Sequence, residues 1–393
     1  MKKILIIGAS ILQLPAIKKA KENGYYTVVV DYNPNAVGAP LADEFHTIST
    51  IDVEKIVSLA KQVRPNGVMT LATDMPMRSV AAVAEALNLP GISPTTAILA
   101  TDKGEMIKAF EAAGVAHPWY HIVSNREELP QILSQITYPC VMKPTDNAGN
   151  RGVCYIEDEK SLLELSEYSF QNSRSGCVII EEFMAGEEVS VEAIVIDNEV
   201  HILAITDKLT MGPPYFVEIG HSEPSQHTPE EVAQIKELSI QAVHALGINN
   251  SPVHIEIMVT KDGPKMVELG ARMGGGCITT HLVPLSTGID MLQCVMDIAM
   301  GEKADLRPQK QMGSALRHIT NLSGVIADIE GIDDVKKNPN VVEVSMLKNI
   351  GDRVEYFKNG SDRIGYVIAQ GSTAQEAVSI CEEALKKINI KIS

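Results

Sequence analysis

Two glutamates, Glu256 and Glu268, are spaced so that they would face each other across a β-hairpin. The stretch VHIEIMV alternates apolar and polar residues, TKDGP is typical of a turn, and KMVEL supplies the return strand. A turn centred on Asp262 makes the two glutamates direct cross-strand neighbours, with Cβ atoms about 5 Å apart. Like charges at this distance repel unless a cation lies between them, and hard cations such as Mg²⁺ bind carboxylate oxygens. The spacing therefore predicts a metal site.

An exposed hairpin whose glutamates diverge into water would have the same pattern. What favours the metal site is the next segment, because Glu268 leads directly into GARMGGG. An arginine beside a glycine-rich backbone suits an anion that is bound to a metal.

Lys143 follows an apolar strand and precedes the loop TDNAGNRGV. The amides of such a loop and the ammonium of a lysine can bind phosphate oxygens. The Walker pattern GxxxxGK[ST] is absent, and a plain surface turn is the common alternative. Lys103, taken alone, is typical of a solvated lysine in the first turn of a helix.

The segment VIIEEFMAGEEVSVE has the pattern of a strand that ends in a hinge. Val178 to Ile180 form a buried strand, and Glu181 to Met184 then emerge at its edge. An adenine ring needs an apolar slot with a backbone donor and acceptor, which a strand edge offers. Glu188 could accept hydrogen bonds from ribose hydroxyls. An acidic hairpin on a solvated face is the alternative.

Strands and helices alternate over residues 1 to about 100. The strands are KILIIGA, YTVVVDYN and GVMTLAT, and the helices are LPAIKKAKENG and DVEKIVSLAKQVRP. This order predicts a parallel, doubly wound sheet. Gly8 is followed by Ser10 and Gln13 where the dinucleotide fingerprint GxGxxG requires glycines. An NAD-dependent oxidoreductase is therefore disfavoured.

The pattern changes after residue 115 to a small α+β unit with strands YPCVMKP and CVIIEEF. Two longer strands, EEVSVEAIVI and EVHILAIT, are joined by Asp197-Asn198, a hairpin signal. A helix over 229–246 has Thr228 as N-cap and Glu231 to complete a capping box. The tail contains the strand RIGYVIAQ and the helix TAQEAVSICEEALKKI.

Size and composition limit the function classes. A chain of 393 residues predicts two or three domains, and 45% hydrophobic with 21% charged residues is ordinary for a soluble globular protein. The formal charge of −16, without a basic cluster, argues against nucleic acid as a partner. The segment MKKILIIGAS reads as a first strand instead of a signal peptide, and no stretch of eighteen apolar residues suggests a membrane span. Six cysteines without CxxC spacing predict reduced thiols in the cytoplasm.

In their order along the chain, Lys103, Lys143 with its loop, EEFMAGEE, Glu256 and Glu268-x-x-x-Arg272 resemble the ATP-grasp superfamily over roughly residues 1–305. ELGARMGGG followed by LSTGIDMLQCVMDIAMG looks closest to the amino-acid and peptide ligase branch, with carbamoyl-phosphate-synthase-like and purine-biosynthesis members as near relatives. The implied fold is a mixed α/β and α+β multidomain one. It comprises a doubly wound parallel-sheet domain (1–100), a small lid domain with its linker (101–185), a larger antiparallel-sheet domain with the metal site (186–305) and an α/β extension (306–393).

The resemblance also implies roles for the residues. The two lysines would bind α- and β-phosphates, the loop at 145–153 with Gly149 and Gly152 would close over the γ-phosphate, and Glu256 and Glu268 would bind one or two Mg²⁺ (or Mn²⁺) ions. The residues implied in adenine and ribose binding are Glu181, Glu182, Phe183, Met184 and Glu188. Many relatives carry Asn two residues after the second glutamate, whereas this chain has Gly270, so the number of metals is open.

The implied reaction is that of an ATP-dependent carboxylate–amine ligase. A small carboxylate attacks the γ-phosphate of ATP to give an acyl phosphate and ADP, and an amine then displaces phosphate. Arg272 is the expected catalytic cation; a salt bridge with Glu268, four residues earlier, is the alternative role, and both could hold together. We expect substrate contacts from His221, Gly275 and Gly276, while His254 would support Glu256.

Three alternatives remain at this point: a purine-biosynthesis enzyme, a carbamoyl-phosphate-type enzyme, and a nucleotide-binding protein without catalysis. The expected partners are small carboxylate and amine substrates, with no nucleic acid and no membrane. A homodimer would be usual for such a fold.

Overall fold

The N-terminal strands form a four-stranded parallel sheet with the order β3-β2-β1-β4. The structure is a computed structural model that describes residues 1–147, 149–319 and 322–393. The elements of this unit are β1 (Lys3–Ile7), α1 (Leu14–Glu22), β2 (Tyr26–Asp31), β3 (Glu44–Thr47), α2 (Val53–Val63), β4 (Gly67–Met69), α3 (Met77–Leu87) and α4 (Pro94–Leu99).

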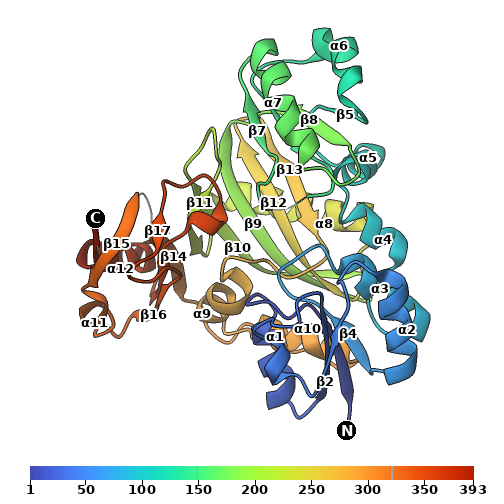
Figure 1. Ribbon diagram of the computed structural model, residues 1–393, viewed down its shortest axis with the longest axis vertical. Helices are drawn as coiled ribbons and strands as arrows, with labels where there is room; N and C mark the ends of the chain where they lie inside the picture. Colours follow the sequence, from blue (N-terminus) through green and yellow to red (C-terminus); the bar gives the residue numbers. More distant parts are fainter. Residues whose placement is uncertain (148, 320–321) are drawn as a thin grey trace.

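Helices cover both faces of this sheet, as a doubly wound fold requires. Ile4 and Ile6 pack in one core cluster with residues of α1 and of the distant α10 (Met291–Ala299), whereas Leu5 and Ile7 pack in another with residues of α2 and α3. The sequence-based expectation of a doubly wound sheet is confirmed, but one covering helix comes from residues 291–299, and Figure 1 shows α10 against the N-terminal strands.

The small α+β unit is a four-stranded antiparallel sheet of order β5-β8-β6-β7. Cys140, Met142 and Ile180 lie in its core, against the helix α7. Its elements are α5 (Lys103–Ala113), β5 (Tyr120–Val123), α6 (Leu129–Ile132), β6 (Cys140–Pro144), β7 (Cys154–Ile156), α7 (Glu159–Gln171) and β8 (Val178–Glu182).

The largest sheet has eight antiparallel strands in the order β13-β12-β9-β10-β11-β14-β18-β16. Asp197 and Asn198 have positive φ angles of 51° and 66° in the β9–β10 turn, as the hairpin signal predicts. The strands are β9 (Gly186–Ile196), β10 (Glu199–Thr210), β11 (Glu218–Glu223), β12 (Ser251–Thr260), β13 (Gly263–Gly270), β14 (Gly313–Ile319), β16 (Val341–Met346) and β18 (Gly365–Gly371).

Helices α8 (Pro229–Ala245) and α12 (Ala374–Lys387) pack on this sheet. The capping box predicted for α8 is present, because Thr228 and Glu231 exchange side-chain to backbone hydrogen bonds. A π-helical turn (Ile278–Leu282) and α9 (Val283–Thr287) lead into α10. A three-stranded sheet completes the C-terminal region with β15 (Gly324–Glu330), β17 (Arg353–Val354) and β19 (Asn389–Ile392), beside α11 (Ile332–Val335).

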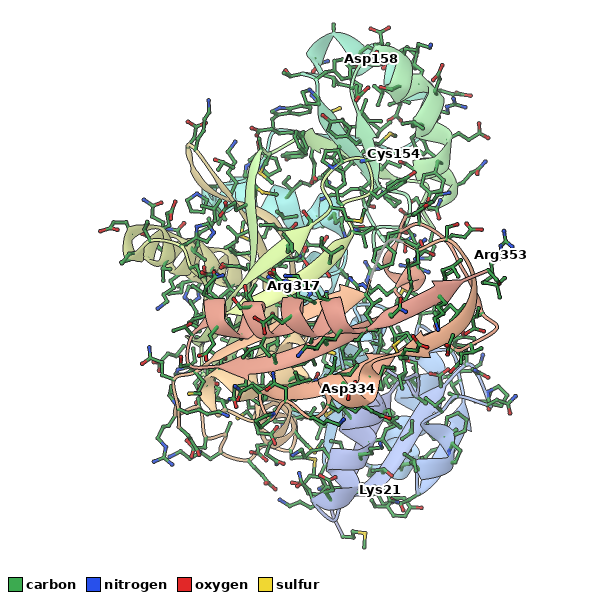
Figure 2. The ribbon with its side chains drawn as sticks, turned by 90° about the vertical axis from the view of Figure 1, so that its left-hand side faces the viewer. Lys21, Cys154, Asp158, Arg317, Asp334 and Arg353 are labelled. Carbon is green, nitrogen blue, oxygen red and sulfur yellow. The ribbon has the colours of Figure 1, made fainter. Side chains whose placement is uncertain are left out.

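The expected boundary after residue 305 does not separate two sheets. Strands β14, β16 and β18 of the C-terminal segment extend the sheet that β9 begins. In Figure 2 this segment, with Arg317 and Asp334, faces the viewer at mid-height, while Lys21 of the N-terminal unit lies below it and Cys154 and Asp158 of the small unit lie above it. The division into four domains remains a prediction.

Within the described residues no single helix is long and apolar enough to cross a membrane. The bent pair 278–287 and 291–299 satisfies that test only by length and composition.

Candidate active site

Glu256 and Glu268 are cross-strand partners on β12 and β13, as predicted, but the turn is not centred on Asp262, because Thr260 pairs with Gly263. A β-bulge between Glu256 and Ile257 shifts the register of the two strands by one residue. The residues nearer the turn, such as Val259 and Pro264, pair in the unshifted register. Without the bulge Glu256 would face Val267 instead of Glu268. The bulge therefore brings the two carboxylates together at the edge of the eight-stranded sheet.

The imidazole of His254 contacts the carboxylate of Glu256. It lies opposite Glu192 of β9, with Nδ1 2.5 Å from Glu192 Oε1, while its Nε2 lies 3.2 Å from Glu256 Oε1. Burial alone would lower the pKa of His254, but the flanking carboxylates raise it to about 9. The imidazole is therefore a cation at neutral pH and orients Glu256, as expected for a residue behind a metal ligand.

The two predicted phosphate-binding lysines bind carboxylates of the same site. Lys103 begins α5, where Asp102 is the N-cap, and its Nζ lies 2.9 Å from Glu268 Oε2. Burial would lower the pKa of Lys103, but the nearby carboxylates of Glu268, Asp74 and Glu181 together raise it. Lys143, buried at the end of β6, pairs with Glu181 Oε2 at 2.6 Å. Each ammonium group therefore already has a carboxylate partner. The phosphates of a nucleotide would have to bind beside that carboxylate or displace it from the lysine.

Lys208 is a central residue of the site that sequence reasoning missed. Its Nζ contacts Glu188 at 2.5 Å, Glu218 at 2.8 Å and Glu256 at 3.1 Å. Burial would lower the pKa of Lys208, but these carboxylates raise it well above its usual value. The sequence held one indication of this role. Lys208 interrupts the alternating segment EVHILAITDKLT, and this strand is adjacent to the strand that carries Glu188.

Arg272 forms its ion pair with Asp74 and not with Glu268, so the expected alternative partner of Arg272 is wrong. Nε lies 2.9 Å from Oδ1 and Nη2 3.0 Å from Oδ2 of Asp74, a bidentate geometry. Burial would lower the pKa of Arg272, but Asp74, with Glu268 and Glu256, raises it. A Cβ at Gly270 would lie 2.8 Å from Asp74 Oδ1, so the glycine makes room for the pair. Asp74 was missed; it follows β4, at the carboxyl end where parallel sheets bind ligands.

The hinge after β8 has an aromatic wall. Phe183 lies 5.1 Å from Tyr155 and 6.1 Å from Phe216 between ring centroids. The Glu182 carboxylate is bound by Lys265 at 2.8 and 3.0 Å, and Met184 is half-buried beside it. An apolar wall next to a strand edge is what an adenine ring requires, so the hinge prediction is compatible with the structure.

The predicted lid loop 145–153 includes residue 148, which lies outside the described residues. Gly149 and Gly152 have positive φ angles of 69° and 81°. A Cβ at Gly152 would lie 2.6 Å from Pro144 Cγ, whereas one at Gly149 would meet open space. Asn150 Nδ2 donates to the Phe216 carbonyl at 3.2 Å, which connects the loop to the segment between β10 and β11.

Of the expected substrate residues, His221 is buried at 0% exposure. Its Nε2 lies 3.7 Å from Glu218 Oε2, and a Cβ at Gly276 would lie 3.0 Å from Nε2, whereas one at Gly275 would meet nothing within 4 Å. Burial lowers the pKa of His221 to about 4, so it is neutral. Neither ring nitrogen has a hydrogen-bond partner in the part of the chain that the structure describes.

Two further residues, both from the C-terminal region, lie near Glu218 and His221. Sequence reasoning missed both. Arg363 Nη2 lies 3.2 Å from Glu218 Oε2. His318 of β14 is also buried, and burial, reinforced by nearby Arg363, lowers its pKa to about 3. The sequence carried no spacing signal for either residue.

The arrangement fits a divalent cation beside phosphates. Over residues 1–147, 149–319 and 322–393, no group of three or more His, Cys, Asp or Glu has the geometry of a metal site. Mg²⁺ is commonly bound by one or two carboxylates together with substrate phosphates and waters, so two glutamates suffice. The described contacts of Glu256 involve Oε1 and that of Glu268 involves Oε2, which leaves their other oxygens for a cation.

Residues 136–281 match the ATP-grasp domain, and residues 317–393 match the L-amino acid ligase C-terminal domain 2. The alanine–anticapsin ligase of Bacillus subtilis is 28% identical over 324 residues, which cover 76% of this chain and 67% of that protein. Among solved structures, an L-amino acid ligase from Bacillus licheniformis superposes with a TM-score of 0.86 at 24% identity, over 100% of this chain and 99% of that one. A phosphoribosylglycinamide synthetase from Anaerococcus prevotii superposes with a TM-score of 0.79 at 25% identity, over 100% of both chains.

Proposed function

The chain belongs to the ATP-grasp superfamily, and we propose that it is an ADP-forming ligase that joins a small carboxylate to an amine. The observation that carries the proposal is the pair Glu256–Glu268, flanked by Lys103 and Arg272. These residues would hold Mg²⁺ (or Mn²⁺) and the phosphates of ATP. The bound metal would neutralise phosphate charge in the transition state.

The proposed chemistry has two steps. A carboxylate oxygen of the substrate attacks the γ-phosphorus, the bond to the β,γ-bridging oxygen breaks, and ADP leaves. The amine then attacks the carbonyl carbon of the acyl phosphate, and inorganic phosphate leaves carrying the proton of the amine. Arg272 would stabilise negative charge on the transferred phosphoryl group or at the tetrahedral carbon, because its fork matches such oxyanions.

We place the carboxylate substrate beside His221, Glu218 and Arg363. The buried and unpartnered imidazole of His221 favours a polar ligand here, since such groups rarely remain without a hydrogen bond. The match of residues 317–393 to the L-amino acid ligase C-terminal domain favours an amino acid as one substrate. A nucleotide-biosynthesis enzyme is the alternative, supported by the whole-chain likeness to the phosphoribosylglycinamide synthetase.

We also propose a cytoplasmic location and, as is usual for such folds, a homodimer. All six cysteines lie in the described part of the chain and carry free thiols, which suits a reducing compartment.

The test is phosphorus NMR of Mg-ATP incubated with the protein and a pool of amino acids and small carboxylates. ADP and phosphate that form only with the pool are the expected result, and subdividing the pool identifies the substrate. AMP and pyrophosphate would mean adenylation and would overturn the mechanism. Bound ATP without turnover for any pool would favour the non-catalytic alternative.

A further inference from the structure

Lys208 lies among three carboxylates that come from three neighbouring strands. Glu188 belongs to β9, Glu218 to β11 and Glu256 to β12, and the Lys208 side chain is only 3% exposed. One of the three, Glu256, is a proposed metal ligand, and another, Glu188, is the proposed ribose contact. The ammonium therefore lies where the proposed nucleotide and metal sites meet.

The cationic partners of the three carboxylates differ. Glu256 also contacts His254 at 3.2 Å, and Glu218 also contacts Arg363 at 3.2 Å. For Glu188, Lys208 is the only cationic partner among the described residues. Lys208 is thus the cation that all three carboxylates share, while His254 and Arg363 supply further positive charge at Glu256 and Glu218.

A divalent cation on Glu256 would share that carboxylate with Lys208, whose Nζ is 3.1 Å from Oε1. Two cations on one carboxylate repel each other, and water screens them only weakly at Glu256, whose side chain is 18% exposed. The triphosphate of a nucleotide brings the negative charge that would offset the added cation. Metal and nucleotide should therefore bind together more favourably than either binds alone.

We propose that Lys208 is a built-in counter-ion that suppresses binding of the free divalent cation and so couples metal binding to nucleotide binding. It is a positioning residue of the active site, because it holds Glu188, Glu218 and Glu256 together. With Lys208 in place, the cluster binds a divalent cation only when phosphates are bound with it. The inference rests on the proposed function, because it takes Glu256 as a metal ligand.

The test uses the affinity of the full chain for Mn²⁺, followed by the electron paramagnetic resonance of the free ion, with and without ADP. Wild type should bind Mn²⁺ weakly alone and much more tightly with ADP. In Lys208→Gln, which removes the charge, affinity for Mn²⁺ alone should rise about tenfold or more, and the gain from ADP should shrink. Lys208→Arg keeps the charge and should behave as wild type.

Lys19→Gln is the matched control, because it breaks another ammonium–carboxylate pair, with Asp290 at 2.6 Å, that lies outside the candidate site. Its affinity for Mn²⁺ alone should equal that of wild type. A Lys208→Gln variant that binds Mn²⁺ alone no more tightly than wild type overturns the coupling.

Wild type alone also tests the proposal if Lys208→Gln does not fold. Equal Mn²⁺ affinity with and without ADP would overturn it even when the phosphorus NMR experiment reveals a ligase. Absence of Mn²⁺ binding even with ADP would instead remove the metal site, and with it both the proposed function and this inference.

Discussion

At the residue scale, the candidate site consists of carboxylates whose charges are each offset by a nearby cation. Glu268 pairs with Lys103, Glu181 with Lys143 and Asp74 with Arg272. Because these pairs lie largely out of water, removing one partner leaves the other uncompensated. Substitutions here should therefore change ligand binding and catalysis strongly. Variants that keep the size of the side chain distinguish the effect of losing the charge from the effect of altered packing.

Glu268→Gln should abolish ATP turnover while the fold persists. Glutamine keeps the shape but loses the charge that binds a metal. Substituting a residue that only hydrogen-bonds to a metal ligand typically lowers activity about 10- to 100-fold, so we expect loss of the ligand itself to lower turnover at least about 100-fold. Steady-state release of ADP measures this, with circular dichroism as the control for folding. Near-normal turnover would remove the proposed metal site.

Lys143→Ala should weaken ATP binding about 10- to 100-fold, since a hydrogen bond to a charged group contributes about 1.5–3 kcal/mol. Isothermal titration with ATP measures the effect. Lys160→Ala is the control, because Lys160 lies exposed on α7 in the same unit, 3.8 Å from Glu164. Unchanged affinity in Lys143→Ala would contradict the phosphate assignment.

At the element scale, a buried carboxyl joins strand β10 to helix α9. Glu223 of β11 is 0% exposed and accepts hydrogen bonds from Thr206 at 2.7 Å and Ser286 at 2.8 Å. Burial raises the pKa of Glu223 to about 8 from 4.5. The folded state therefore prefers the protonated form over a wide pH range, and the packing of these elements depends on it.

Stability should consequently fall as pH rises. The contribution of Glu223 is fully present below pH 4.5, the unfolded value, and is lost as pH rises through about 8. Glu223→Gln cannot ionise and should remove that loss, so it should be more stable than wild type above pH 8, by on the order of a few kcal/mol. Urea unfolding at pH 5 and pH 9 tests this. Equal pH dependence in both proteins would refute the assignment.

At the scale of the whole molecule, the site is assembled across units that are distant in sequence. Asp74 follows the N-terminal sheet, Arg272 follows β13, and Arg363 reaches Glu218 from the C-terminal region. The eight-stranded sheet itself runs through the C-terminal strands β14, β18 and β16. Contacts between units therefore position the residues that we assign to catalysis.

Asp74→Asn should lower stability and catalysis together. Breaking a buried ion pair typically costs about 3–5 kcal/mol, and this pair is partly exposed, so we expect about 2–3 kcal/mol. Urea unfolding and ATP turnover are the measurements. Lys2→Gln is the control, because it breaks an exposed ion pair, with Glu302, that also joins the N-terminal unit to the later chain. If only stability fell, Asp74 would not position Arg272 for the reaction.

Local features of this protein were predictable from sequence. Alternation identified β9, β10, β12 and β13, and the capping box located the start of α8. These features depend on residues a few positions apart, whose geometry follows from the period of a helix or strand. The ATP-grasp resemblance added the order of the motifs along the chain, and the fold that it implied is confirmed.

The partners of the charged groups were decided only by the tertiary structure. Arg272 and Asp74 are 198 residues apart, and Lys208 meets its three glutamates only because β9, β11 and β12 are brought around β10 in one sheet. Even the Glu256–Glu268 register depends on a bulge that alternation does not reveal. Periodicity determines which face of an element a residue occupies, whereas the packing of whole elements determines which distant charge it meets.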